Sequence, residues 1–283
     1  MSHFMKMGGL EVHLISDGLF SLDGGAMFGV IPKPLWEKAA PPDARNRIRL
    51  AMNCLLVRTA SQWVLIEAGA GDKLDAKRQD IFALGGPPRL LDHMAALGVR
   101  PGDVSLVVNT HLHFDHCGWN TRLAGGHLSP TFPYARYAVQ RGELEWSAHP
   151  TERDRGSYMA ENIAPISDAG KWWLLDGDGE VAPGIRVIRV PGHNRDMQCV
   201  LLEGGGRTIF LPVDLCPTRH HVATHWVMSY DLYPVQTMEN KKKWLAEAAR
   251  NNWLCVLCHE ADTPTGYMRE HQGKLAFEPA PFA

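Results

Sequence analysis

The stretch His111-Leu112-His113-Phe114-Asp115-His116 is the most informative part of this 283-residue chain, because it places four metal-ligand side chains in six consecutive residues. Three of the four are histidines, the commonest metal ligands in proteins, and the fourth is a carboxylate. A solvated loop of histidines is the alternative, but clustered imidazoles need a partner and a metal is the usual one. We therefore interpret the stretch as the centre of a metal site.

The segment just before this stretch has the composition of a buried strand. Residues 104–108 read Val-Ser-Leu-Val-Val and follow Pro101 and Gly102. A short run rich in β-branched residues with turn residues at its start predicts a strand, here one that ends near Thr110. The ligands therefore follow the C-terminal end of a strand.

The spacing of the ligands indicates how they are shared. Side chains alternate along an extended chain, so His111 and His113 are predicted to point to the same side and to share one metal. Asp115 and His116 are adjacent and reach a common ion only if the chain turns, and Gly118 offers a flexible position for that turn. This arrangement favours two metals.

Three further strand candidates each end on a residue that can bind a metal. Open α/β sheets have their binding crevices at the carboxyl ends of strands, so we expect these residues to join the hexapeptide in one site. The predicted strands are residues 185–190, 208–213 and 253–258, and the ligand candidates that follow them are His193, Asp214 and His259.

With these residues in view, the chain resembles the metallo-β-lactamase superfamily, whose members carry a His-x-His-x-Asp-His motif, a distant Gly-His, an Asp after a strand and a late His. The resemblance extends from the first strand candidate near Val12 to His259. It implies an α/β fold: a four-layer αβ/βα sandwich with two mixed sheets face to face and metals at one edge. It also implies that one metal is bound by His111, His113 and His193, the other by Asp115, His116 and His259, with Asp214 bridging the two.

The ligand set predicts the metal and the reaction class. It contains only nitrogen and oxygen donors, which favours two Zn²⁺, with Mn²⁺, Co²⁺ or Fe²⁺ as alternatives. Relatives that reduce oxygen or nitric oxide carry Glu at the position of His113, so we expect hydrolysis. Two cations can activate a bridging hydroxide and polarise a carbonyl or phosphoryl oxygen, and Asp115 is the predicted catalytic residue that passes the proton to the leaving group.

The resemblance also narrows the substrate class. Asp214 stands where several true β-lactamases have Cys or Ser, which favours lactonases, esterases and phosphotriesterases. The N-acyl homoserine lactone lactonases typically carry a Tyr three residues after the bridging Asp, but this chain has Pro217 there, which has no side-chain donor. The residues nearest in sequence that could replace that Tyr are His220, His221, Tyr230 and Tyr233.

We therefore expect a hydrolase acting on a small, partly apolar ester or lactone. A phosphotriester hydrolase is the nearest alternative, because the same metal pair stabilises both kinds of oxyanion. A third hypothesis is a metal-containing ligand-binding or signalling protein with little turnover.

The substrate pocket has weaker sequence signals than the metal site. In residues 24–30, Gly-Gly-Ala-Met-Phe-Gly-Val, large apolar side chains lie between glycines in a predicted loop. Such a loop is either a plug in the core or a mobile rim that packs on an apolar substrate. The candidate pocket residues are Met27, Phe28, Trp119, His220, His221, Trp226, Met228 and Tyr230.

The overall composition excludes several partners. Lysine and arginine total 29 against 31 acidic residues, and the net charge of -2 offers no cationic track for nucleic acid.

No apolar run reaches signal-peptide or transmembrane length, so we expect a cytoplasmic protein with no membrane partner and a small-molecule substrate. Six cysteines without framework spacing fit a reducing compartment. Residues 1–283 are predicted to form a single domain, and a homodimer is compatible with it.

Two helices and a pair of thiols complete the predictions. One helix begins at Pro87-Pro88, buries Leu91, Met94 and Ala95, and stops at Gly98. Another has an apolar stripe of Met238, Leu245 and Ala248, which would leave lysines 241–243 on its solvated face. Cys255 and Cys258 lie three residues apart in a predicted strand, so they face opposite sides and are expected to be core thiols and no redox pair.

Overall fold

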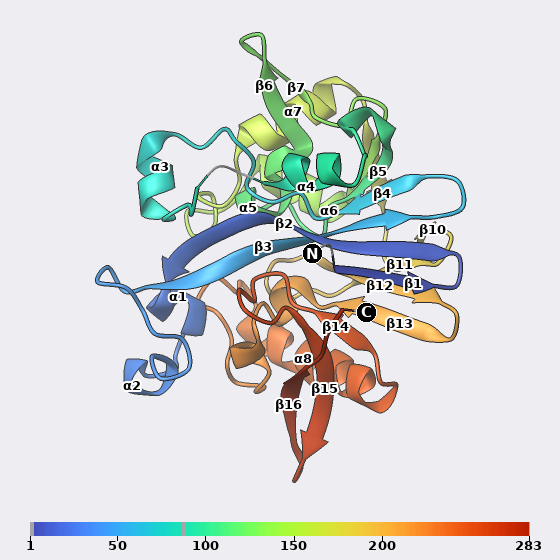
Figure 1. The fold of residues 1–283 in the computed structure, drawn as a ribbon. Coiled ribbons are helices and arrows are strands. Elements are labelled where there is room, and N and C mark those ends of the chain that lie inside the picture. Colours follow the sequence, from blue (N-terminus) through green and yellow to red (C-terminus); the bar gives the residue numbers. More distant parts are fainter. Residues whose placement is uncertain (1–2, 87–88, 283) are drawn as a thin grey trace.

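Two mixed seven-stranded sheets that face each other form the centre of the protein, seen here in a computed structural model that describes residues 3–86 and 89–282 (Figure 1). In the first sheet, β1 to β4 pair antiparallel, and β4, β5, β8 and β9 run parallel. Its strands, in spatial order, are β1 (His3–Met7), β2 (Leu10–Asp23), β3 (Arg47–Arg58), β4 (Trp63–Ile66), β5 (Val104–Val108), β8 (Arg136–Gln140) and β9 (Trp172–Leu175).

The second sheet is antiparallel except for the parallel pair of β13 and β14. Its strands are β10 (Gly179–Ala182), β11 (Ile185–Arg189), β12 (Gln198–Gly204), β13 (Arg207–Leu211), β14 (Leu254–Val256), β15 (Thr265–His271) and β16 (Lys274–Pro279). A separate hairpin consists of β6 (Thr121–Ala124) and β7 (His127–Pro130).

Helices cover the outer faces of both sheets. The α-helices are α1 (Gly24–Phe28), α2 (Lys33–Trp36), α3 (Ala76–Ile81), α4 (Leu90–Ala96), α5 (Phe114–Cys117), α6 (Arg141–Ala148), α7 (Ala160–Asp168) and α8 (Pro234–Arg250). Four 3₁₀ turns are η1 (Pro101–Asp103), η2 (Gly118–Asn120), η3 (Val213–Leu215) and η4 (Arg219–His221). In Figure 1, α4, α6 and α7 lie above the sheets and α8 lies below them.

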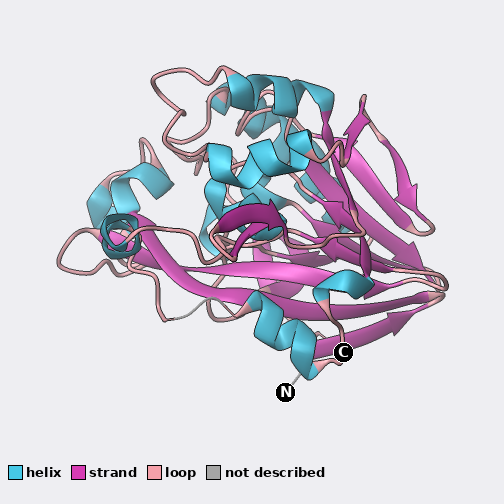
Figure 2. Cartoon of the chain, turned by 90° about the horizontal axis from the view of Figure 1, so that it is seen from above, coloured by secondary structure: helices cyan, strands magenta, loops and turns pink. Residues whose placement is uncertain are grey.

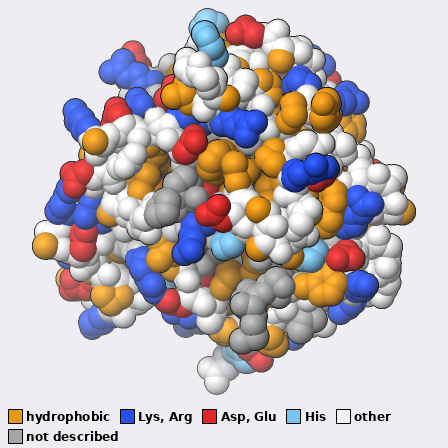
Figure 3. Space-filling view, turned by 45° about the horizontal axis from the view of Figure 1, so that its top comes forward, with side chains coloured by type: hydrophobic (Ala, Val, Ile, Leu, Met, Phe, Trp, Pro, Cys, Tyr) orange, Lys and Arg blue, Asp and Glu red, His pale blue; other side chains and the backbone are white. Residues whose placement is uncertain are grey.

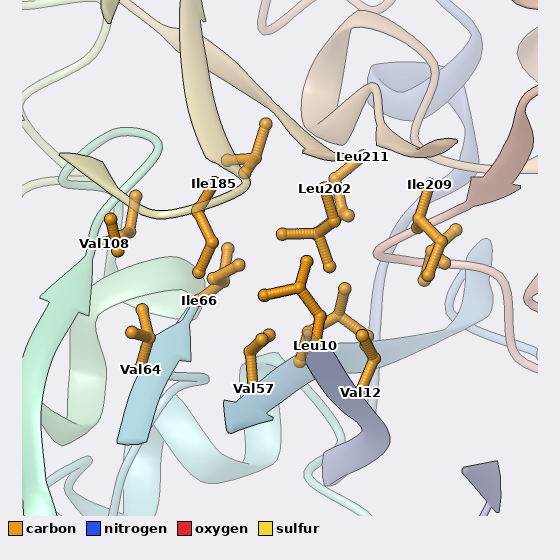
Figure 4. Close-up of a cluster of buried hydrophobic side chains, with 14 of the residues drawn as sticks. Leu10, Val12, Val57, Val64, Ile66, Val108, Ile185, Leu202, Ile209 and Leu211 are labelled. Atoms are coloured by element: carbon orange, nitrogen blue, oxygen red, sulfur yellow. The ribbon is translucent and has the colours of Figure 1, made fainter. Parts of the chain in front are cut away.

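The largest apolar core fills the space between the two sheets. Figure 4 shows side chains of the first sheet, such as Val12 of β2 and Ile66 of β4, directed toward side chains of the second sheet, such as Leu202 of β12 and Ile209 of β13. These residues alternate along their strands with residues that face the outer layers, as a strand buried on both faces requires. The inner faces of the two sheets therefore pack against each other through this apolar core.

Two further cores lie under the outer helices. Leu65 and Val107 of the first sheet pack with Leu90 and Met94 of α4. On the second sheet, Phe210 and Cys255 pack with Leu245 and Ala248 of α8. Figure 2 shows the helices on the outside of the strands. The predicted four-layer αβ/βα sandwich is confirmed.

The two predicted helices exist with corrections to their buried faces. In α4, Leu90 and Met94 are buried, but Ala95 is exposed. Pro87 and Pro88, the predicted start of this helix, lie outside the described residues. In α8, Lys241 is wrongly predicted to be solvated: it is buried, and its Nζ donates hydrogen bonds to the carbonyls of Ala223 (2.7 Å) and Trp226 (2.9 Å). The lysine therefore anchors the loop before α8.

The surface carries charges of both signs. On the face drawn in Figure 3, lysine and arginine side chains are interspersed with aspartate, glutamate and hydrophobic ones, as the near-neutral net charge of -2 suggests. Among the described residues, no helix combines the length and the apolar character that crossing a lipid bilayer needs.

Candidate metal centre

The seven predicted ligands converge at one edge of the sandwich, and all of them are buried. The hexapeptide follows β5 in the first sheet, while the other three follow strands of the second sheet. His193 comes after β11, Asp214 after β13 and His259 after β14. Segments separated by more than a hundred residues thus meet because the carboxyl ends of their strands lie at the same edge.

The ligand atoms fall into two groups joined by one carboxylate. His111, His113 and His193 form one group, and Asp115, His116 and His259 form another, with the ligand atoms of each group within 4.8 Å of one another. Asp214 lies between them. Its Oδ2 is 3.2 Å from His193 Nε2, and its Oδ1 is 3.2 Å from His259 Nε2. Oδ2 also lies 3.6 Å from His116 Nε2 in the second group, so the Asp214 carboxylate contacts both groups.

A short helix makes the turn that brings Asp115 and His116 to the second group. His113 has extended backbone angles and precedes α5, so the helix begins directly after it. Gly118 does not act as the flexible position predicted for this turn, because its φ is an ordinary -57°. It is required for a different reason: a Cβ at Gly118 would lie 2.0 Å from the carbonyl carbon of Ala70.

The orientation of the histidine rings fits cation binding. Nδ1 of His193 bonds to Asp231 Oδ1 (3.0 Å), and Nδ1 of His259 bonds to the carbonyl of Ala51 (2.8 Å). In each ring Nδ1 donates, so Nε2 presents a lone pair to the site. His259 Nε2 lies 3.2 Å from His116 Nε2, and two such lone pairs repel unless a cation lies between them.

Burial and charge favour the metal-binding protonation states of His111, His113 and Asp214, whereas the carboxylates around His116 favour its charged form in the absence of a cation. Nε2 of His111 is buried without a hydrogen-bond partner among the described residues. Burial, reinforced by the neighbouring histidines, holds the pKa of His111 and of His113 well below the ordinary value. Burial opposes charge on His116 too, but carboxylates, Glu67 first, raise its pKa well above normal. Burial would raise the pKa of Asp214, but the surrounding histidines hold it well below its usual range. Neutral imidazoles and an ionised carboxylate are the forms that bind metals.

Two acidic residues that the sequence reasoning missed orient the histidines. Asp231 bonds to Nδ1 of His193, and Glu67 bonds to Nδ1 of His116.

Two residues beside the site have unusual backbone angles. Glu67 directly follows β4 and has a φ of 68°, and Val213, next to Asp214, has a φ of 50°. Such backbone angles are costly for residues other than glycine and cluster at functional sites. An acidic residue directly after a short apolar strand is the signal that could have revealed Glu67.

Replacing Glu67 with glutamine should weaken metal binding. Glu67 accepts a hydrogen bond from Thr110 N at Oε1 (3.2 Å) and contacts His116 Nδ1 with Oε2. In Glu67→Gln, one of these oxygens becomes an NH₂ group that faces a donor. We expect affinity for the second metal to fall roughly 10- to 100-fold, as is typical when an outer partner of a ligand is lost.

The measurement for Glu67→Gln is competition with a chromophoric chelator, and Glu145→Gln, at an exposed residue, is the control. The midpoint of chemical unfolding of the metal-free protein is measured alongside. Unchanged affinity in Glu67→Gln would contradict the assigned role of Glu67.

A cavity of about 240 Å³ opens onto the ligands. His113, Asp115, His193, Asp214 and His259 lie on its floor. Its walls are partly apolar and partly polar, and comprise Leu22, Met27, Phe82, Phe114, Arg153, Gly156, Ser157, Met228 and Tyr230. Of the predicted pocket residues, Met27, Met228 and Tyr230 therefore line this cavity.

Phe28 is not part of the pocket rim. Residues 24–28 form the helix α1 and not a loop, because the Asp23 side chain accepts a hydrogen bond from Ala26 N (2.8 Å) and caps it. Phe28 is fully buried and stacks on Trp36 and His221, with ring centroids 5.3 Å and 4.9 Å away. The core alternative for Phe28 therefore holds, while its neighbour Met27 reaches the cavity.

Four other predicted pocket residues lie elsewhere. Trp119 packs in the core under α4, where its Nε1 donates to Asp17 Oδ1 (2.8 Å). His221 is buried beside Phe28, and Trp226 packs edge-on against the same ring. His220 lines a separate cavity beyond His259. Sequence proximity to the ligands does not fix which side of a loop faces the cavity.

Comparisons with known proteins identify the family of the chain. The sequence profile of the metallo-β-lactamase superfamily matches residues 48–259. The chain belongs to this superfamily. The N-acyl homoserine lactonase of Bacillus cereus is 26% identical over 168 residues, which cover 56% of this chain and 60% of the relative. The lactonase of Bacillus thuringiensis is 29% identical over 134 residues, 47% of each chain. The chain thus matches only about half to three fifths of these relatives' length.

Solved structures match over nearly the whole chain. The structure of a probable metal-dependent hydrolase from Staphylococcus aureus is 29% identical, with a TM-score of 0.90 over 98% of this chain and 99% of that one. AidC, described as a dizinc quorum-quenching lactonase, is 19% identical, with a TM-score of 0.81 over 99% and 97%. At this low identity, the likeness to AidC indicates the fold alone.

Proposed function

We propose that the protein is a metal-dependent hydrolase that binds two divalent cations and cleaves a small ester or lactone. Zn²⁺ is the cation that we expect at both sites. The observation that carries the proposal is the pair of buried donor groups that share Asp214 beneath a cavity. His111, His113 and His193 would hold one cation, and Asp115, His116 and His259 the other. Membership of the superfamily and the hydrolase among the structural neighbours support the same reading.

When bound, two such cations lower the pKa of a water molecule and polarise a carbonyl or phosphoryl oxygen. The residues of the chain supply the rest. Asp214 keeps the two groups together, and Asp231 and Glu67 orient the histidines through their Nδ1 atoms. Asp115 lies on the cavity floor, where its carboxylate would accept the proton of the attacking water and pass it to the departing oxygen.

The cavity supports a small, partly apolar substrate. Its volume of about 240 Å³ is just under the range of roughly 300 to 1,000 Å³ that is usual for drug-sized ligands. Met27, Phe114 and Met228 offer apolar contacts, and Tyr230 and Arg153 lie among them. Because two relatives of the chain are N-acyl homoserine lactonases, a lactone is a better candidate substrate than other esters.

A substrate panel tests this proposal. Protein loaded with defined metals is assayed on unactivated lactones, aryl esters and phosphotriesters, and turnover is expected to be highest for lactones or esters. A kcat/KM that is higher for phosphotriesters than for lactones and aryl esters would identify the protein as a phosphotriester hydrolase instead. Negligible turnover on every member, with tight binding of one of them, would contradict a hydrolase and favour a ligand-binding protein.

A further inference from the structure

Ester and lactone hydrolysis benefits from a hydrogen-bond donor at the oxygen on which negative charge develops. Pro217 has no such donor, so another group must supply it if the site acts on unactivated substrates. Four residues near Pro217 in sequence carry donors, and their surroundings separate them. This step rests on the proposed hydrolase function.

Three of the four are unsuited to the role. Both ring nitrogens of His221 are engaged, Nδ1 with Thr218 Oγ1 and Nε2 with the carbonyl of Met27, each at 2.8 Å. His220 lies in the separate cavity beyond His259. Tyr233 is 39% exposed and precedes α8, away from the cavity that holds the ligands.

Tyr230 differs from these three residues because it lines the cavity together with Asp115, Asp214 and His259. Its hydroxyl has no hydrogen-bond partner within the described part of the chain, so the donor is available to a ligand. Burial, together with Asp23 and Asp115, raises the pKa of Tyr230 to about 12. The phenol therefore keeps its proton at neutral pH.

The backbone on both sides of Tyr230 is held in place. Arg153 donates hydrogen bonds from one guanidinium nitrogen to the carbonyls of Ser229 (2.5 Å) and Asp231 (2.9 Å). Ser229 N in turn donates to the carbonyl of Ala26 (2.8 Å), and Asp231 is the residue that orients His193. Tyr230 is therefore carried by a segment tied to the pocket wall and to the metal centre.

We propose that the Tyr230 hydroxyl donates a hydrogen bond to the leaving-group oxygen of the substrate, which becomes negatively charged as an ester or lactone bond with a poor leaving group breaks. Tyr230 contributes no proton to the products in this role; it stabilises charge by a fixed donor. The position differs from that of the Tyr typical of the lactonases that the chain resembles, since it comes sixteen residues after Asp214 instead of three.

The experiment compares Tyr230→Phe with two matched variants. Tyr233→Phe removes a tyrosine hydroxyl outside the cavity. Ser157→Ala removes a serine hydroxyl from a residue that lines the cavity. The substrates are N-hexanoyl homoserine lactone, which is unactivated, and 4-nitrophenyl acetate, whose leaving group needs little help. Metal content and thermal unfolding are measured for every variant.

In Tyr230→Phe, kcat/KM for the lactone should fall on the order of 100-fold, as on loss of a preorganised donor, and that for the aryl ester less than about threefold. Tyr233→Phe should match the wild type. An equal fall for both substrates, no fall, or a selective fall in Ser157→Ala instead would overturn the role of Tyr230.

Calorimetric binding separates this inference from the proposed function. The probe is the ring-opened product, N-hexanoyl homoserine, and its Kd should rise about tenfold in Tyr230→Phe but not in Tyr233→Phe. If the wild type hydrolyses neither substrate, the proposed function fails, and the binding comparison still decides whether Tyr230 contacts the ligand. Equal Kd in the wild type and in Tyr230→Phe would overturn that contact.

Discussion

If two cations are bound as proposed, replacing His116 with alanine should remove one of them and lower kcat/KM by at least about a thousandfold. His116 Nε2 lies 3.2 Å from His259 Nε2 and 3.6 Å from Asp214 Oδ2, so it is central to the second donor group. The variant leaves that group with Asp115 and His259 besides the shared Asp214. Hydrolysis by a metal pair depends on both cations, hence the large expected loss.

Metal content and steady-state kinetics are measured together for this variant. His225→Ala, which changes an exposed histidine, serves as the control and should retain both metals and full activity. If His116→Ala keeps wild-type kcat/KM with one metal, the reaction depends on a single cation and the two-metal proposal is wrong.

The second large effect concerns stability. Phe28→Ala should lower the free energy of unfolding by roughly 3 to 5 kcal/mol, the usual cost of deleting a buried phenylalanine ring. Phe28 is fully buried between Trp36 and His221, so no neighbour can fill the space without moving. Preference among acyl chain lengths should stay unchanged, because Phe28 does not line the cavity.

Urea unfolding and kcat/KM for short and long acyl substrates test this expectation. Val30→Ala is the matched control from the same segment, since Val30 is 85% exposed and should change the unfolding free energy by less than about 0.5 kcal/mol. A Phe28→Ala variant of normal stability that loses only long-chain substrates would return Phe28 to the pocket rim.

The metal centre could be predicted from sequence because its residues follow strand ends. A strand can be recognised locally from its β-branched residues, and its carboxyl end marks where a ligand such as Asp214 or His259 will emerge. The family motif then indicated how the ligands are shared. The local signals located strands and ligand candidates, whereas the two sheets, their outer helices and the grouping of the seven side chains were implied by the resemblance to the superfamily. The ligand roles themselves stay a prediction.

The pocket could not be predicted in the same way. Whether Met27 or Phe28 reaches the cavity depends on the rotation of α1, which is set by packing against Trp36 and His221 and not by either residue alone. Lys241 was misread for a similar reason: two loop carbonyls from outside α8 satisfy its amino group. Long-range partners of this kind leave no periodic pattern in the sequence.

Glu67 illustrates an intermediate case. It directly follows a short apolar strand, as the predicted ligands do, but nothing in the sequence distinguishes a residue that binds a metal from one that orients His116. Only the meeting of β4 and β5 in the sheet, parallel and adjacent, brings Glu67 beside the hexapeptide.

The central claim, that seven buried side chains hold two cations, is tested most directly by counting metals. Metal-free protein is reconstituted with excess zinc, freed of loosely bound ions by dialysis, and analysed for zinc per chain by inductively coupled plasma mass spectrometry. The account predicts two zinc ions per chain. A single tightly held ion after full reconstitution would contradict it.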